Sequence, residues 1–271
     1  MATLVGQSRG ASAEAVATLT DQLTGSAGEL ASVADGLFAA SRTLRSEAAL
    51  RRFATDVSVP AEAKQGLVRE LFDGKIAAGA LTLLANAAGL RWTASHDLAD
   101  ALERLSEIAA VRSAGDDAER LVDELFSVER LVQQNPELRD ALSDPLRSVD
   151  DKLTLVDSLL AGKALPATVT LVKQALAGTY RTVSVALAEY QQVAAAVRNE
   201  GVATVRVAKP LTDAQLERLE AALARGYGRP VHLNLVVDPE VLGGIKVEIG
   251  DDVIDGTVAS RLDDARRALA G

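Results

Sequence analysis

The chain has 271 residues, of which 48% are hydrophobic and only 3% aromatic, and its formal net charge is −9. This acidic balance, with no run of Lys or Arg, lacks the cations that replace phosphate counterions, which argues against a nucleic-acid-binding protein. The sequence contains no Cys, so disulfides, thiolate metal sites and cysteine redox chemistry are excluded. The core must be built from Ala, Leu and Val, which favours closely packed helices.

The amino-terminal segment and the hydropathy predict no direct membrane insertion. The first residues lack both the basic and the apolar region of a signal peptide. No stretch approaches the roughly 20 uninterrupted apolar residues that a spanning helix needs. We expect a soluble, cytoplasmic chain that would reach a membrane only through a partner.

The sequence matches itself without a gap when it is shifted by 88 residues. The matched pairs include Phe38 and Phe126, Arg42 and Arg130, Asp56 and Asp144, and Lys64 and Lys152. So dense a match indicates an internal duplication. The same shift lays residues 12–23 over 100–111, so we expect a helix there that closes one bundle and adjoins the next.

Three domains follow from this repeat and from a change of pattern near residue 200. Residues 1–112 and 113–200 are predicted to be two tandem helical bundles. Residues 201–271 are predicted to form a small α/β domain, with a short-stranded sheet packed with two helices. The fold class is therefore mainly α with a small α/β C-terminal domain.

Helix signals are clear in the second copy. Asn135 followed by Pro136 is typical of an N-cap and the first helical residue. Ser148 with Asp151 resembles a capping box that opens the next helix. An amphipathic stripe at helical spacing comes from Leu121, Leu125, Val128 and Val132.

Beyond Gly201 the pattern alternates, as in half-buried strands. A short strand around Arg206 precedes a helix that opens with Thr212 and Gln215 in a capping box. Alternation over residues 231–237 predicts a second strand. Alternation over 245–249, a turn, and Val253-Ile254 predict a hairpin. A last helix is expected from the apolar positions Val258, Leu262, Ala265 and Leu269.

Candidate chemical groups are few. His96 and His232 lack a second His, a Cys or clustered carboxylates at ligand spacing, so we predict structural or surface roles and no metal site. Gly74-Lys75 and Gly162-Lys163 fail as phosphate loops because no Ser or Thr follows, and they suit helix C-caps. No catalytic set, cofactor site or small-molecule substrate site is predicted.

Gly243-Gly244 also fails as a nucleotide loop, since a strand follows it where a helix N-terminus would hold phosphate. A turn in which one or both residues need a positive φ explains the pair better.

The C-terminal stretch from Val236 to Gly250, continued by Val253–Val258 and Arg261-Leu262, closely resembles a known signature. It is similar to the C-terminal hallmark of the delta subunit of F-type ATP synthases, the family of the mitochondrial oligomycin-sensitivity-conferring protein. The signature residues, which we interpret as structural, are Asp238, Gly243, Gly244, Gly250, Asp255, Gly256, Thr257, Arg261 and Leu262.

The resemblance implies a non-catalytic stator subunit in the peripheral stalk, on the cytoplasmic face of the cell membrane. In that family a six-helix bundle binds N-terminal helices of alpha subunits, largely between its first and fifth helices. Here the fifth-helix stretches would be Ala77–Leu90 and Pro166–Ala177, one in each copy. The C-terminal domain of the family holds the ends of the b-subunit helices. A duplicated bundle resembles a longer variant of the family, and leaves open which copy binds alpha.

Two other interpretations remain open on the sequence alone. One is an unrelated helical-repeat adaptor, which would share the duplication but has no reason to carry the C-terminal signature. The other is an enzyme that binds phosphate at the C-terminal turns, against which the missing Ser or Thr and the following strand both argue.

Overall fold

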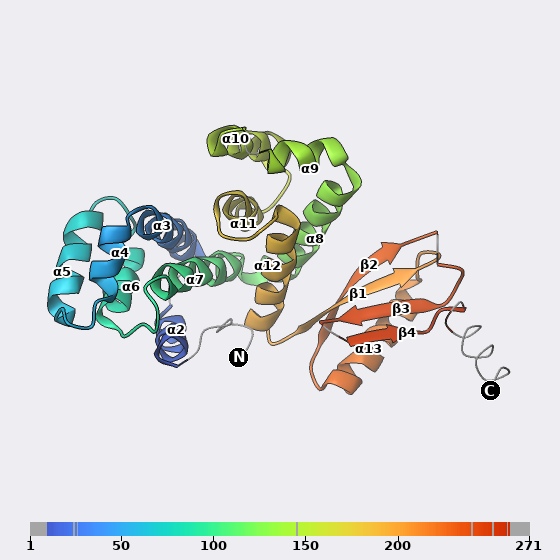
Figure 1. Cartoon of the computed structure of the whole chain (residues 1–271). Coiled ribbons are helices and arrows are strands. Elements are labelled where there is room, and N and C mark those ends of the chain that lie inside the picture. The colour runs from blue at the N-terminus through green and yellow to red at the C-terminus, as the bar shows by residue number, and fades with distance from the viewer. Residues whose placement is uncertain are drawn as a thin grey trace, which may run out of the picture. The chain divides into compact units, whose positions relative to one another are not determined.

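The computed structural model describes residues 10–23, 25, 27–144, 146–239, 241–250, 252–258 and 260. The chain divides into two compact units, residues 1–197 and residues 198–271. The first is helical and the second contains the sheet (Figure 1). The predicted fold class, mainly α with a small α/β C-terminal domain, is confirmed.

The helices of the first unit repeat along the chain. The first six are α2 (Ala11–Gln22), α3 (Ala27–Ser46), α4 (Ala48–Thr55), α5 (Ala61–Phe72), α6 (Ala78–Gly89) and α7 (Asp97–Ser113). After the 3-10 turn η1 (Gly115–Asp117) come α8 (Ala118–Gln134), α9 (Pro136–Ser143), α10 (Val149–Leu160), α11 (Pro166–Ala177) and α12 (Val183–Val197). A shift of 88 residues carries the bounds of α4, α5 and α6 onto those of α9, α10 and α11, which confirms the duplication.

Helix-capping residues mark several of these bounds. Gly74 and Gly162 follow α5 and α10 with φ of 68° and 71°, so the C-cap interpretation of the two Gly-Lys pairs is confirmed. Ser148 Oγ accepts from the Asp151 N–H at 3.1 Å, as a capping residue should. Asn135 is the N-cap residue of α9 and Pro136 its first residue, as predicted, and the Asn135 side chain donates to the Leu131 carbonyl of the preceding helix without capping α9 itself.

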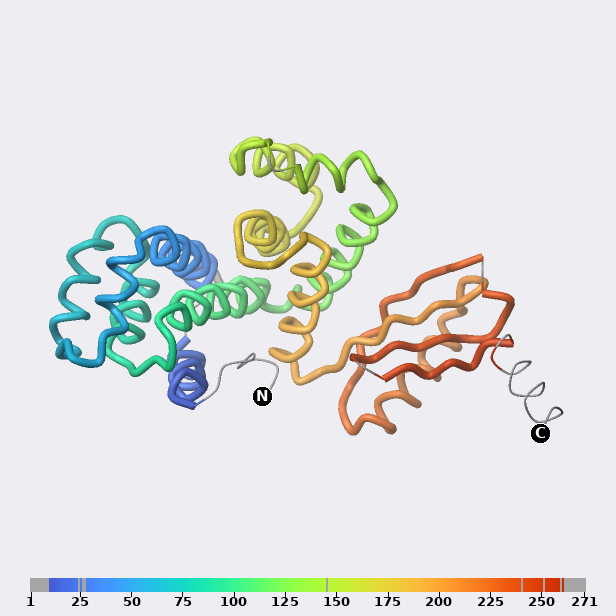
Figure 2. The backbone as a smooth tube through the Cα atoms, viewed as in Figure 1, coloured from blue at the N-terminus to red at the C-terminus, as the bar shows by residue number. Residues whose placement is uncertain are grey.

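Helix α7 belongs to both bundles. It packs against α2, α3 and α6 on one side and against α8, α11 and α12 on the other. Figure 2 shows residues 97–113 running between the two sets of helices. Every residue of this helix from Ala101 to Val111 is buried except Arg104, which is half-buried. The apolar side chains of both copies form one continuous core. The division of this unit at residue 112 stays a prediction.

The second unit contains a four-stranded sheet in the order β2-β1-β3-β4. Its strands are β1 (Gly201–Val207), β2 (Val231–Val237), β3 (Ile245–Ile249) and β4 (Asp252–Asp255), with helix α13 (Asp213–Tyr227) between β1 and β2. β1 pairs in parallel with β2 and antiparallel with β3, and the predicted hairpin is β3 and β4.

Helix α13 covers one face of this sheet. Its Leu219, Leu223 and Tyr227 join the strand residues Ala203 and Val205 and others in a core of their own. The Thr212 N–H donates to Gln215 Oε1 at 2.9 Å, which confirms the predicted capping box. The second helix expected against the sheet, with Leu262, Ala265 and Leu269, lies outside the described residues beyond Ser260.

Candidate functional site

Four of the signature residues gather around one tight turn: Gly243, Gly244, Gly256 and Thr257. Gly243 and Gly244 have φ of 127° and 87°, so the predicted need for positive φ is confirmed at both positions. The Val258 N–H donates to the Gly243 carbonyl at 3.0 Å, and the Gly256 N–H donates to the Ile245 carbonyl at 2.9 Å. The turn before β3 is thus fastened to the segment that follows β4.

Gly244 tolerates no side chain in this arrangement. A Cβ atom placed on it would collide with the carbonyl oxygen of Gly256 and lie 2.8 Å from the Thr257 Cα atom. Both neighbours are backbone and cannot rotate away. The glycine is therefore required by space as well as by conformation.

Asp255 and Thr257 stabilise the segment after β4, to which the turn is bonded. Asp255 Oδ1 accepts from the Thr257 hydroxyl at 2.7 Å and from the Thr257 N–H at 2.9 Å. These hydrogen bonds, the hydroxyl first, hold the pKa of the Asp255 carboxyl below its usual value. Asp238 donates its N–H to the Val207 carbonyl, and Gly250 turns the hairpin with φ of 57°. Arg261 and Leu262 lie outside the described residues.

A second candidate surface lies on the first helical copy, between α2 and the segment that follows α6. A hollow of about 430 Å³ is lined by Ala11, Glu14, Ala15 and Thr18 of α2, and by Val57 and Trp92 among others. Asn86 of α6 donates to Gln22 of α2 at 3.0 Å, which ties the two helices together. This pair contains the first and fifth helices of the first bundle, and α6 occupies the expected stretch.

The sequence interpretation missed a buried polar cluster on α7. Glu103 is 3% exposed and accepts from the Thr179 N–H at 2.9 Å and the Thr179 hydroxyl at 2.8 Å. It also pairs with Arg45 of α3. The absence of a side chain at Gly178 makes room for the Glu103 carboxylate, because a Cβ there would collide with Glu103 Oε1. The cluster joins α3 of the first copy to the loop after α11 in the second.

Glu107, one turn further along α7, is 1% exposed. It pairs with Arg104 at 2.8 Å and accepts from the Tyr180 hydroxyl at 3.0 Å. Burial raises the pKa of Glu107 to about 7, against the opposing pull of Arg104. One signal could have revealed both carboxylates: the repeat aligns Glu103 and Glu107 with the apolar Ala15 and Leu19, which are buried.

This raised pKa predicts a pH-dependent stability. Between the ordinary value of 4.5 and about 7, the folded chain binds more protons at Glu107 than the unfolded chain does. The stabilisation from the protonated carboxyl is therefore complete below about pH 4.5 and is lost as the pH rises through about 7. We expect Glu107→Gln to remove this slope, worth a few kcal/mol, in urea unfolding measured from pH 5 to 8.

The matched control is Asp56→Asn. A hydrogen bond from the Ser58 hydroxyl lowers the pKa of Asp56, so this carboxyl stays ionised across pH 5 to 8. Its replacement should leave the slope unchanged. An unaltered slope in Glu107→Gln would contradict the assignment.

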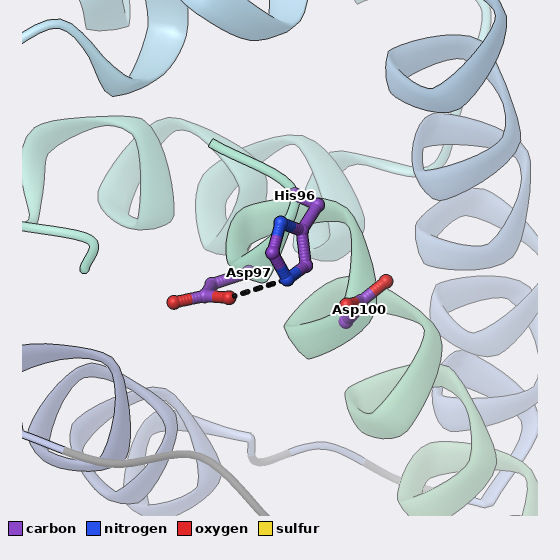
Figure 3. Close-up of side chains that lie close together, drawn as sticks. All are labelled: His96, Asp97 and Asp100. Atoms are coloured by element: carbon purple, nitrogen blue, oxygen red, sulfur yellow. Dashed lines mark ion pairs between the residues drawn. The ribbon is translucent and has the colours of Figure 1, made fainter. Parts of the chain in front are cut away.

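A third cluster contains His96, Asp97 and Asp100, whose ligand atoms lie within 4.8 Å of one another (Figure 3). The expectation that His96 has no clustered carboxylates beside it was therefore wrong. The carboxylates are already engaged, however: Asp97 Oδ2 accepts from Ser12 at 2.6 Å, and Asp100 pairs with Arg45 at 2.9 Å. The His96 side chain is 70% exposed, which suits the predicted surface role. The absence of a metal site stays a prediction.

Comparisons with known proteins point to one family. A sequence family described as "ATP synthase delta (OSCP) subunit" matches residues 105–269. Proteins named "ATP synthase subunit delta" are similar over nearly their full length. The Nocardioides sp. protein is 62% identical, covering 97% of both chains. The Streptomyces avermitilis and Kineococcus radiotolerans proteins are 44% and 42% identical, each covering 98% of both chains. None of the described helices is long and apolar enough to cross a membrane.

Proposed function

Because the chain belongs to the ATP synthase delta (OSCP) subunit family, we propose that its helical unit binds N-terminal helices of alpha subunits and its C-terminal unit binds the C-terminal helices of the b subunits. The protein is a non-catalytic component of the peripheral stalk of an F-type ATP synthase. The similarity over 97% of the chain rules out the unrelated adaptor and the phosphate-binding enzyme. It is a peripheral member of its complex, and we place it on the cytoplasmic face of the cell membrane.

The division into two units is the observation that carries the proposal. Each unit has its own apolar core, so each can hold a different partner. The helical unit offers a hollow along α2, a shape that accepts an amphipathic helix. In the C-terminal unit, we propose that the signature glycines, Asp255 and Thr257 keep the shape of the turn and do not contact the partner.

The continuous core of the helical unit suits a part that resists torque. The two copies are joined by α7 and by the buried ion pair between Arg45 and Glu103. A helix shared between two bundles allows little hinge motion between them, because it would have to leave one core to follow the other. We propose that the protein links the catalytic head to the stalk and transmits force without yielding.

Affinity purification of the tagged protein from its native cells tests the assignment. Alpha, beta and b subunits should be recovered with it in stoichiometric amounts. Recovery of the tagged chain without them would contradict the stalk assignment for this protein.

Removal of residues 201–271 tests the division of labour. The cut precedes β1 and leaves the core of the helical unit intact. We expect the shortened chain to keep its helical circular dichroism and its binding of an alpha N-terminal peptide. We expect it to lose binding to the b subunits entirely, measured by pull-down with the purified C-terminal region of a b subunit. Retained b binding would show that the two tasks are not divided in this way.

A further inference from the structure

We infer that only the first helical copy offers the open face of its first helix to a partner helix, because α3 of the same chain covers the equivalent face of α7 in the second copy. The inference rests on the proposed function and names which of two candidate grooves carries it. The grooves are equivalent under the 88-residue shift, which carries α2 onto α7 and α6 onto α11. In both copies these two helices are in contact.

The outer faces of α2 and α7 differ completely in exposure. On α2 one stripe at helical spacing is exposed: Glu14, Ala17, Thr18 and Asp21. The equivalent positions on α7 are fully buried at 0% exposure: Leu102, Leu105, Ser106 and Ala109. The sequence agrees, since polar and small residues on α2 are replaced mostly by apolar ones on α7. The first face remains available, and the second is core.

The double role of α7 explains this difference. As the last helix of the first bundle, it must turn one face toward α3 and α2. As the first helix of the second bundle, it would need that same face free to border a groove. One face of a helix cannot be both packed and open. In this structure α3 packs against that face of α7, so the face does not border an open groove.

Helix α3 also reaches the fifth helix of the second copy, since α3 and α11 are in contact. Arg45 of α3 pairs with Glu103, which is the equivalent of Ala15 in the lining of the first hollow. Gly178 and Thr179, the equivalents of Leu90 and Arg91 in that lining, border a hollow of about 560 Å³ whose other wall is α3 and whose described lining contains no residue of α7. In the second copy α3 therefore lies over the part of α7 that corresponds to the α2 side of the first hollow.

The residues of α3 that contact α7 indicate which kind of helix the open face of α2 can bind. α3 presents the small Ser41, which donates to the Ala99 carbonyl at 2.8 Å, and the basic Arg45, which pairs with Glu103. In the first copy, α2 supplies the acidic Glu14 and Asp21 and contains no Lys or Arg. The occupant that fits is an amphipathic helix with small residues on its apolar face and a basic side chain beside it. Under the proposed function it is the N-terminal helix of one alpha subunit.

Titration of the full-length chain with a synthetic alpha N-terminal helix, followed by isothermal calorimetry, tests the inference. We expect one peptide per chain. Val57→Glu and Thr18→Arg, both at the rim of the hollow, should each weaken binding at least tenfold. Val57 is 71% exposed and Thr18 is exposed, so neither change should lower the unfolding midpoint.

The matched control is Val185→Glu on α12 of the second copy, where the valine is 52% exposed and away from the hollow. It should bind within twofold of the original chain. Two equivalent peptides per chain, or full affinity in both rim variants, would overturn the inference and leave the proposed function standing. No binding by the unaltered chain would instead contradict the proposed function itself.

Discussion

Replacing Gly244 by valine is expected to unfold the C-terminal unit. The residue has a φ of 87°, which valine adopts only at a cost of about 1–3 kcal/mol. The added Cβ would also collide with the Gly256 carbonyl and approach the Thr257 Cα atom to 2.8 Å. Overpacking against backbone costs about 1–3 kcal/mol more. The sum, about 2–6 kcal/mol, is comparable with the whole stability of a small domain.

Hydrogen exchange of the strand amides measures this effect in the full chain, because the helical unit should keep its protection. The control is Gly226→Ala on α13, where a Cβ meets nothing within 4 Å. It should stabilise the helix by about 0.5–1 kcal/mol. Gly243→Ala should fall between the two, since its φ is 127° but the nearest atom is the flexible Val258 side chain at 3.4 Å. Unchanged protection of β3 in Gly244→Val would refute the argument.

The C-terminal unit was largely predictable because its signals are local. Alternation gave β2 and β3 at their observed bounds, and the two turn glycines showed the positive φ expected of them. Strand order was beyond the same reasoning. The parallel pairing of β1 with β2 joins residues 30 positions apart, such as Gly201 and Val231, and no local pattern encodes such a pair.

In the helical unit, Asn135-Pro136 predicted where α9 begins, the family resemblance implied the range of α11, and the repeat predicted the shared role of α7. The buried charges on α7 could not be predicted from its own pattern. Glu103 and Glu107 stand one turn apart, which is the usual arrangement on a solvated face. Only the second bundle, packed on that side, turns the face into an interior. The cluster at His96 was detectable in the sequence, because Asp100 follows His96 by four residues, a spacing that places both on one face of a helix.

Replacing Glu103 by alanine is expected to destabilise the helical unit by about 3 kcal/mol, the lower end of the range for breaking a buried ion pair. The change leaves the Thr179 N–H and hydroxyl without their acceptor, and Arg45 without its buried partner. The lower end applies because the Arg45 side chain is 23% exposed and can regain water. Urea unfolding followed by circular dichroism at the helical band measures the loss. Glu103→Gln, which keeps an acceptor oxygen, should lose about half as much.

Gly178 provides an independent measure of the same contact. Its φ of −87° is open to any residue, so the glycine is needed only for space. Gly178→Ala should cost about 2–3 kcal/mol, because the new Cβ collides with Glu103 Oε1 and lies 2.8 Å from the Gln174 carbonyl. In the Glu103→Ala background the first collision is gone and the second remains, so the same change should cost less by about 1 kcal/mol. If the costs of Gly178→Ala and Glu103→Ala were strictly additive, the absence of a side chain at residue 178 would not be needed to accommodate the Glu103 carboxylate. A coupling of the expected sign would place α7 and the loop after α11 in one interdependent contact.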